Sequence, residues 1–518
     1  MAKCLLVHAP VRAQDRPRHI PYGLAILANI IRDKHEVAIC DMNIQRMNYS
    51  NTDDLYNEYL RECLEAAKWN FVGIGGLSSM YKDIKKILPM TRKLAPQSTI
   101  IGGGGWITYI AKDMMELNPE VDIACVGESF ETLPEILDGK SPRDIKSIYY
   151  REDNQLIATP PRGLYHDVDM LPFPAYDLLD MELYFRNSSS NECVESMNAK
   201  RRTDGIYEYG CPRSCNFCSH NGASRYDLVA LYGKERVREL DKEAGYFQNV
   251  ARWQSPKYIV ENTWYLYNTY NLDFLTNMDE NMCSNRKRVF ELCDRLISEK
   301  LNEKVLWGAL GDTASVDDEM ISKMKESGCR YISFGGESAS DRILLHDIQN
   351  GVTRKHAQNA VDTMKRCQMR PLMTFQIGFP TETIDDILET TSFFVENNIR
   401  SDCFIDTAYP GTQYFIKHRK YLLAQYDPLI EQYPDDKERE KRALERMLID
   451  FDDATDMSAT VSQHFNQVEL LGLKALVANN DMRRILLFAH QTGRTHASKW
   501  DSWCDICSQT KRMLISND

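Results

Sequence analysis

The chain has 518 residues, 43% of them hydrophobic, and at roughly 100–200 residues per domain it should form two to four domains. Its 63 basic residues are outnumbered by 75 acidic ones, and the net charge of −12 argues against general nucleic-acid binding, which needs a basic face. No apolar run approaches the roughly 18 residues that span a bilayer, and the N-terminus lacks a secretory pattern. We therefore expect a cytoplasmic protein without membrane or nucleic-acid partners.

Residues 1–140 alternate short β-rich runs with helical stretches, starting with a strand and a helix at 21–32. The strands expected here cover residues 3–8, 35–41, 71–76, 99–105 and 121–127. Because each strand is separated from the next by enough chain for a crossover helix, the pattern predicts a Rossmann-like, doubly wound parallel sheet.

Glycine-rich segments follow three of these strands. They are Gly75-Gly76-Leu77-Ser78-Ser79, Gly102-Gly103-Gly104-Gly105 and Gly127-Glu128. Ligands of such sheets bind beyond the carboxyl ends of the strands, where glycine lets them approach the backbone closely. We interpret these segments together as a binding crevice, with ordinary turn chemistry as the alternative.

The segment 141–200 is polar and irregular, and Leu171-Pro172-Phe173-Pro174 excludes a regular helix, so we expect an extended linker there. Residues 201–415 alternate strands and helices again, which predicts a partial α/β barrel of about six strands. Its expected strands cover residues 205–209, 272–277, 305–309, 331–335, 371–378 and 403–409. Residues 416–518 should be helical, and the mixed charges of 435–446 are typical of a solvated helix face.

The chain carries fifteen cysteines, and in a reducing compartment they should be thiols or metal ligands. Cys211, Cys215 and Cys218 stand out because the Cys-x₃-Cys-x₂-Cys spacing puts three thiols on one short loop after a strand. Three thiolates can ligate three irons of a 4Fe–4S cluster and leave the fourth iron free for a substrate. A zinc site completed by His220 and three unligated thiols are the alternatives.

This triplet, with Phe217 before its last cysteine, resembles the signature of the radical S-adenosylmethionine superfamily. Three later segments agree with the resemblance: Phe334-Gly335-Gly336-Glu337, Phe375-Gln376-Ile377-Gly378-Phe379-Pro380 with Glu382 after it, and Tyr409-Pro410-Gly411-Thr412. The resemblance implies that Gly335, Gly336 and Glu337 receive the methionine amino group and that the Gln376 segment borders the adenine. The S-adenosylmethionine residues that it implies are Phe217, Gly335, Gly336, Glu337, Gln376 and Ile377.

The order of motifs over residues 1–180 is similar to the cobalamin-binding subclass of this superfamily. The cobalamin contacts that it implies are Leu77, Ser78, Ser79, Met80, Tyr81, Gly103, Gly104, Gly105, Gly127 and Glu128. The Asp-x-His-x-x-Gly motif, which supplies the lower cobalt ligand in many cobalamin proteins, is absent, and His8 lacks its context. We therefore expect another group below the cobalt, with Met80 or Tyr81 nearest; a domain that kept the fold without the ligand is the alternative.

The two resemblances together imply a cobalamin-dependent radical S-adenosylmethionine enzyme that methylates an unactivated carbon of a small-molecule intermediate, through methylcobalamin and a 5′-deoxyadenosyl radical. A flavodoxin-type reductant would be its partner. A non-methylating oxidoreductase, which contracts or cyclises a ring, is the alternative, and a cobalamin-responsive binding protein is a third possibility. The sequence singles out no catalytic side chain. Cys283 and Cys403 lie near strand ends, and we favour core packing over substrate contact for both. The Cys504–Cys507 pair is a weak metal or redox candidate, with ordinary surface or core cysteines as the favoured alternative.

Overall fold

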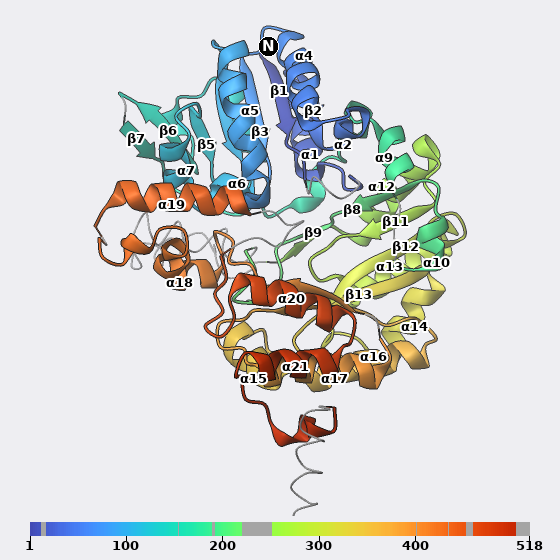
Figure 1. Cartoon of the computed structure of the whole chain (residues 1–518). Helices are drawn as coiled ribbons and strands as arrows, with labels where there is room; N and C mark the ends of the chain where they lie inside the picture. Colours follow the sequence, from blue (N-terminus) through green and yellow to red (C-terminus); the bar gives the residue numbers. More distant parts are fainter. Residues whose placement is uncertain are drawn as a thin grey trace, which may run out of the picture.

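The computed structural model describes residues 1–11, 17–153, 155–188, 192–219, 251–399, 401–433, 435–451 and 459–503. A seven-stranded sheet carries the N-terminal part of the chain and a curled six-stranded sheet the central part, and the C-terminal helices lie beside both (Figure 1). None of the described helices is long and apolar enough to cross a membrane.

The N-terminal sheet has the strand order β2-β1-β3-β4-β5-β6-β7, and its first five strands are parallel. These five strands are β1 (Lys3–His8), β2 (Glu36–Asp41), β3 (Phe71–Gly75), β4 (Thr99–Gly103) and β5 (Ile123–Cys125). All five lie within the runs expected from the sequence, so the predicted parallel sheet is confirmed. Its carboxyl edge carries the three glycine segments.

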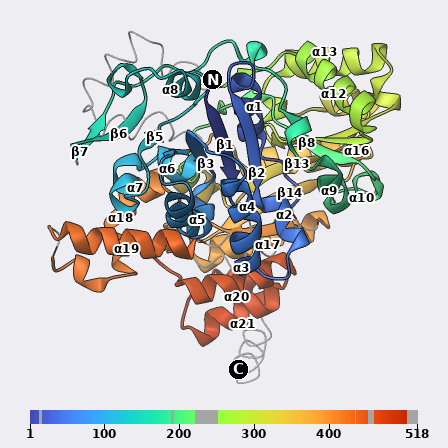
Figure 2. The ribbon, with the colours of Figure 1, turned by 90° about the horizontal axis from the view of Figure 1, so that it is seen from above.

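Both faces of this sheet are buried, which defines it as doubly wound. Leu5 and Val7 of β1 point into one hydrophobic cluster, and Cys4 and Leu6 into another on the opposite face. The helices of this part are α1 (Tyr22–Ile31), α2 (Met42–Gln45), α3 (Thr52–Asp54), α4 (Arg61–Glu65), α5 (Tyr81–Leu94), α6 (Gly105–Thr108), α7 (Ala111–Leu117) and α8 (Thr132–Leu137). Helices α5 and α7 cover the first face, and α1 and α8 cover the second (Figure 2).

The sheet continues beyond residue 140, where the sequence predicted an irregular linker. Strands β6 (Ile148–Glu152) and β7 (Gln155–Ala158) add to it in antiparallel fashion, so the linker prediction is wrong for this stretch. The apolar part of β6 is only three residues long and is followed by Arg151 and Glu152, so the sequence pattern does not identify this strand. Helices α9 (Met181–Asn187) and α10 (Val194–Asn198) follow before the second sheet begins.

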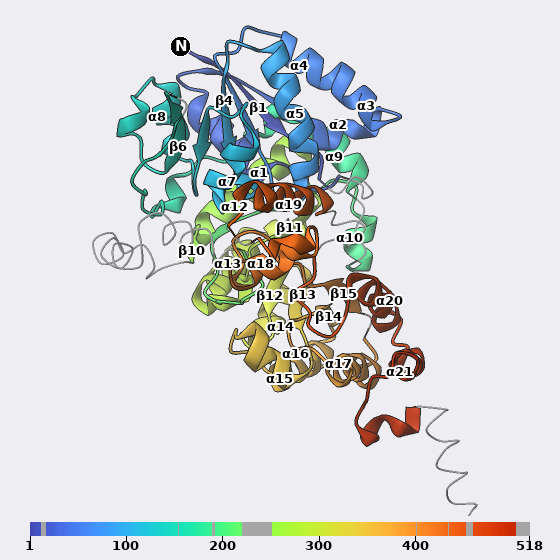
Figure 3. The same cartoon turned by 60° about the vertical axis from the view of Figure 1, so that its left-hand side comes forward.

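The second sheet is parallel throughout, in the order β15-β14-β13-β12-β11-β8, and curls into the predicted partial barrel (Figure 3). Its strands are β8 (Arg202–Gly205), β11 (Phe274–Asn277), β12 (Leu306–Asp312), β13 (Cys329–Glu337), β14 (Leu372–Ile377) and β15 (Ser401–Ile405). Its helices are α12 (Pro256–Tyr270), α13 (Arg286–Ser298), α14 (Asp318–Glu326), α15 (Asp341–Ile343), α16 (Arg354–Arg366) and α17 (Ile384–Asn397).

Two barrel strands end earlier than predicted: β15 at Ile405 rather than at residue 409, and β8 at Gly205 rather than at residue 209. The strand expected at 205–209 is β8, which ends at Gly205, whereas β9 (Glu208–Tyr209) pairs antiparallel with β10 (Arg252–Trp253) in a separate ribbon. Arg202 and Asp204 make β8 polar, although both are buried inside the curled sheet, so apolar patterning alone misplaces this strand.

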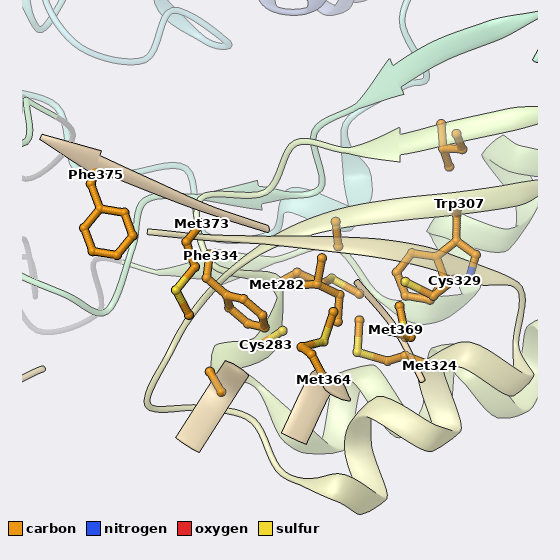
Figure 4. Close-up of a cluster of buried hydrophobic side chains, with 14 of the residues drawn as sticks. Met282, Cys283, Trp307, Met324, Cys329, Phe334, Met364, Met369, Met373 and Phe375 are labelled. Atoms are coloured by element: carbon orange, nitrogen blue, oxygen red, sulfur yellow. The ribbon is translucent and has the colours of Figure 1, made fainter. Parts of the chain in front are cut away.

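The outer face of the barrel packs on its helices through a sulfur- and aromatic-rich core (Figure 4). This core contains Met282, Cys283, Trp307, Met324, Cys329, Phe334, Met364, Met369, Met373 and Phe375. Cys283 is 1% exposed and Cys403 is 4% exposed in the same cluster. Both cysteines are therefore packing residues rather than substrate contacts.

The C-terminal part is helical as predicted, with α18 (Gln413–Ala424), α19 (Lys437–Asp450), α20 (Gln467–Ala478) and α21 (Met482–Gln491). Helix α19 is not a freely solvated helix, because Leu444 and Met447 are fully buried in the core that α5 and α7 share. Its charged face pairs with the same helices, with Lys441 Nζ 2.8 Å from Glu116 and Glu445 2.8 Å from Lys85 Nζ. Cys504 and Cys507 lie outside the described residues.

Candidate functional site

The three motif cysteines lie on a non-helical loop after β9, and all three are partly buried and outside any disulfide. Asn216 fixes the middle of this loop. Its backbone N–H donates to the Ile348 carbonyl at 3.0 Å, its side-chain amide donates to the Asp347 carbonyl at 2.7 Å, and its carbonyl accepts from the Gln413 N–H at 3.0 Å. The loop is thereby held against the segment that follows β13 and against the start of α18.

The thiols interact with one another and with the end of β13. Burial raises the pKa of Cys211 to about 11, and the pKa of Cys215 is raised by burial and then by Glu337, Cys218 and Cys211 nearby. Within the described residues no three His, Cys, Asp or Glu side chains, the three motif cysteines included, converge closely enough to hold a metal ion. Three thiols on one loop can ligate three irons of a 4Fe–4S cluster, whereas a tetrahedral zinc site would need a fourth ligand. His220 lies outside the described residues.

The segments expected to hold S-adenosylmethionine end two adjacent strands. Gln376 of β14 donates from Nε2 to Oε2 of Glu337 at the end of β13, over 2.6 Å. A side chain at Gly335 would displace the Glu337 carboxylate, and one at Gly336 would clash with the Phe375 ring. Glu337 adopts a φ of +59°, in the left-handed region that few side chains adopt, and this backbone fixes where its carboxylate lies.

Glu337 is also electrostatically unusual, because burial raises its pKa to about 7 although the Gln376 hydrogen bond opposes the rise. A carboxyl group in that range becomes charged when a cationic ligand binds beside it. The Ile377 side chain is fully buried in the outer core, so only its backbone can face a ligand. The Phe217 ring lies edge-on to Phe379, with ring centroids 6.4 Å apart.

The glycine edge of the N-terminal sheet is partly open. An added side chain would meet nothing within 4 Å at Gly103 or at Gly127. Gly104 differs, because its φ is +85° and a Cβ there would lie 2.6 Å from the Gly76 carbonyl oxygen. Gly105 faces Leu77, whose Cα would lie 3.7 Å from its Cβ. Gly103 and Gly127 are therefore the positions where a ligand can approach the backbone.

In the loop from Leu77 to Tyr81, the two residues expected nearest the lower cobalt face are both buried. Met80 is buried and its sulfur accepts from the Leu77 N–H at 3.0 Å, while the Tyr81 hydroxyl donates to Asn118 at 3.1 Å in the core. The Ser78 hydroxyl donates to the Gly105 carbonyl at 3.1 Å, and Ser79 is half-buried. Leu77 is 56% exposed and is therefore more accessible to a ligand than Met80 or Tyr81.

Glu128 forms an ion pair that its position in the sequence does not indicate. Its Oε2 accepts from Arg252 Nη1 at 2.9 Å and from the Tyr165 N–H at 3.0 Å, and its Oε1 pairs with Arg252 Nη2. Arg252 belongs to β10, so the ion pair joins the glycine edge of the N-terminal sheet to the ribbon beside the cysteine loop. Arg252 is 124 residues away from Glu128 in the chain, and no sequence pattern predicts this ion pair.

His8 is held in a network that the sequence analysis missed. Its Nδ1 lies 3.1 Å from Oδ1 of Asp41, and the Tyr184 hydroxyl donates to Oδ2 of Asp41 at 2.6 Å. The histidine is 8% exposed at the carboxyl end of β1. Asp41 at the end of the adjacent strand was the available signal for this pair, since partners in parallel strands lie side by side.

A surface hollow of about 890 Å³ lies outside this region, between α15, α17 and residues 497–500. Its charges already pair with one another: Arg342 with Asp386, Arg354 with Glu396 and Lys499 with Glu389. We therefore do not count it as part of the functional site.

Known families match both halves of the chain. The B12 binding domain matches residues 10–137, and the Radical SAM superfamily matches residues 207–394. The chain is thus a radical S-adenosylmethionine enzyme with an N-terminal B12 binding domain, and its cofactors are a 4Fe–4S cluster, S-adenosylmethionine and cobalamin.

Several named proteins are related over much of the chain. An uncharacterized methyltransferase of Pyrococcus horikoshii is 28% identical over 76% of this chain and 77% of its own length. An anaerobic magnesium-protoporphyrin IX monomethyl ester cyclase of Cereibacter sphaeroides is 22% identical over 65% of this chain, which spans about half (51%) of the cyclase. Cytidylyl-2-hydroxyethylphosphonate methyltransferase of Streptomyces wedmorensis is 21% identical over 78% of both chains.

Solved structures share the fold. The radical S-adenosylmethionine methyltransferase TsrM of Kitasatospora setae superposes with a TM-score of 0.61 at 14% identity, covering 82% of this chain and 77% of TsrM. The cobalamin-dependent S-adenosylmethionine radical enzyme OxsB superposes with a TM-score of 0.60 at 14% identity, covering 96% of this chain and 62% of OxsB.

Proposed function

We propose that this enzyme methylates an unactivated carbon of a small-molecule biosynthetic intermediate. The observation that carries the proposal is the Glu128–Arg252 ion pair, which joins the open glycine edge to the ribbon beside the cysteine loop. Methyltransferases among the relatives support methylation over other radical reactions.

The proposal assigns binding residues to each cofactor. Cys211, Cys215 and Cys218 hold the cluster; Phe217, the Gly335–Gly336–Glu337 turn and Gln376 hold S-adenosylmethionine; the open backbone at Gly103 and Gly127, with Leu77 beside it, holds cobalamin. When bound, these groups supply an electron for the cleavage of S-adenosylmethionine and a methyl group for transfer.

The protein's own residues bind, orient and exclude water. Glu337 receives the ammonium group of S-adenosylmethionine, and Gln376 keeps its carboxylate pointed at that ligand. The Tyr109 ring lies against Gly411, so the edge of the N-terminal sheet touches the loop that ends the barrel. Arg419 of α18 adds a second contact through Asp113, with Nη1 3.0 Å from Oδ2. These contacts narrow the access of water to the site between the two sheets.

The substrate class and the reductant of the enzyme follow from the chain's charge and from the same assignment of cofactors. A small molecule suits the chain's net charge of −12 better than a nucleic acid does. A flavodoxin-type reductant would supply the electron, and it would dock where the cysteine loop is partly exposed.

A second candidate is a radical reaction without methyl transfer, such as a ring closure. The similarity to the anaerobic magnesium-protoporphyrin IX monomethyl ester cyclase favours it, although this chain spans only 51% of that protein.

Product mass separates the two candidates. Anaerobic enzyme is reconstituted with iron, sulfide and hydroxocobalamin, then turned over with S-adenosylmethionine that carries a deuterated methyl group. Methylation predicts a product that gains the labelled methyl group, together with S-adenosylhomocysteine. A product without the label, formed alongside 5′-deoxyadenosine, would identify the second candidate.

A further inference from the structure

A buried carboxyl group without a hydrogen-bond partner lies at the end of the last barrel strand. Asp406 follows β15 and is 1% exposed, and neither Oδ1 nor Oδ2 has a partner in the part of the chain that the structure describes. A carboxyl group removed from water without a partner destabilises a folded protein by several kcal/mol. Such a group is retained where a ligand supplies the missing partner.

The strand geometry aims Asp406 into the barrel. Cys403 and Ile405 point into the outer core, so the alternating residues point inward. The Asp406 N–H donates to the Ile377 carbonyl at 2.8 Å, which continues the strand pairing through this residue. Asp406 therefore ends on the inner face at the carboxyl edge, where barrels of this kind carry their active sites.

Among the described residues, the two charged groups that act on the Asp406 carboxyl are both acidic. Burial raises its pKa well above the ordinary value, and Glu337 and Asp347 raise it further. Asp347 is already satisfied by the N–H and hydroxyl of Thr381, each 3.0 Å away, and Glu337 by Gln376. Among these three carboxyl groups, only Asp406 lacks a hydrogen-bond donor, in a region that would attract a cation.

We infer that Asp406 is a further S-adenosylmethionine residue, whose carboxylate accepts hydrogen bonds from the ammonium group that Glu337 also receives. An ammonium group carries three N–H donors, so it can serve two carboxylates. The sulfonium of the same ligand has none and cannot satisfy the Asp406 oxygens. The inference rests on the proposed placement of S-adenosylmethionine at the ends of β13 and β14.

The first test is ligand binding by reconstituted, anaerobic enzyme. Asp406→Asn should weaken S-adenosylmethionine and S-adenosylhomocysteine alike, by about tenfold or more, because both carry the ammonium group. The affinity for 5′-methylthioadenosine, which lacks the amino acid, should not change. Asp402→Asn removes an exposed carboxylate from the other end of the same strand and is the matched control, with unchanged affinities.

The second test is thermal stability without ligand. Asp406→Leu removes the unpartnered carboxyl group, so the midpoint of unfolding should stay or rise. A fall of several degrees would show a structural role and overturn the inference. So would a loss of affinity for S-adenosylmethionine alone, or a change confined to the KM of the methylated substrate.

Glu337→Gln separates this inference from the proposed function. If Glu337→Gln weakens S-adenosylmethionine and Asp406→Asn does not, the inference fails and the proposed site stands. If neither variant weakens it, the ligand lies elsewhere and both fail.

Discussion

Arg252 donates to both carboxylate oxygens of Glu128, with Nη1 2.9 Å from Oε2, and so joins the glycine edge of one sheet to the ribbon beside the cysteine loop of the other. The Arg252 side chain is 8% exposed and that of Glu128 is 24% exposed, so the pair is largely removed from water. Its position makes it one of the contacts that join the glycine edge to the region of the cysteine loop.

Breaking this pair should uncouple the two halves. Arg252→Met leaves Glu128 unpaired and should lower the free energy of unfolding by about 3 kcal/mol. It should also lower the cobalamin that the purified protein retains, while iron content stays. The control is Arg143→Met, since Arg143 pairs with Glu152 at 69% and 34% exposure and its loss should cost under about 1 kcal/mol. Equal effects of the two variants in urea unfolding would contradict the role of Glu128.

The cysteine loop predicts a sharp pattern of iron content. Replacing Cys211, Cys215 or Cys218 by Ala should remove most iron and abolish 5′-deoxyadenosine formation, because each thiolate ligates one iron. Cys367→Ser changes a partly exposed thiol beside Ser322 and should leave iron content and 5′-deoxyadenosine formation unaffected. Retention of the cluster by the triple Ala variant would refute the assignment.

The glycine edge allows cobalamin to be removed selectively. Gly103→Val places a side chain where nothing lies within 4 Å, so the protein should fold normally, keep its cluster and lose bound cobalamin. Gly104→Ala is different, since its Cβ would lie 2.6 Å from the Gly76 carbonyl oxygen at a φ of +85°, and it should destabilise the domain itself. Normal cobalamin content in Gly103→Val would show that the crevice is only a turn.

His8 should not ligate cobalt. The chain lacks the motif that presents a lower histidine ligand, and His8 is only 8% exposed. We expect His8→Ala to bind cobalamin with an unchanged optical spectrum. A shifted spectrum in this variant would identify His8 as the axial ligand.

The raised pKa of Glu337 predicts a pH dependence. Its pKa of about 7 means that the carboxylate which attracts the ammonium group forms as pH rises through 7, so S-adenosylmethionine should bind more tightly at pH 8 than at pH 6. The ligand-free fold should lose stability over the same rise, because the folded state holds a proton that the unfolded chain has released. Glu337→Gln should flatten the pH dependence of binding, and a slope unchanged in Glu337→Gln would contradict this assignment.

Strand periodicity predicted β1 to β5 because these strands are apolar runs buried on both faces. Sequence periodicity failed where polar residues are buried and where a charged segment contains buried apolar residues. Arg202 and Asp204 are buried in β8, and α19 hides buried Leu444 within a charged run. The cysteine spacing marks a site that is local in the chain. The role of Glu128 depends on its distant partner Arg252. That of Asp406 depends on the lack of a hydrogen-bond partner among the described residues. Only the folded structure shows either.

The most direct test of the account is the cofactor content of one preparation, reconstituted anaerobically with iron, sulfide and hydroxocobalamin. Iron, sulfide and cobalamin are then measured against protein after gel filtration. The account predicts about four irons and one cobalamin per chain, with iron lost in Cys215→Ala and cobalamin lost in Gly103→Val. One cobalamin per chain in both variants, or a full cluster without cobalamin in the unmodified protein, would contradict it.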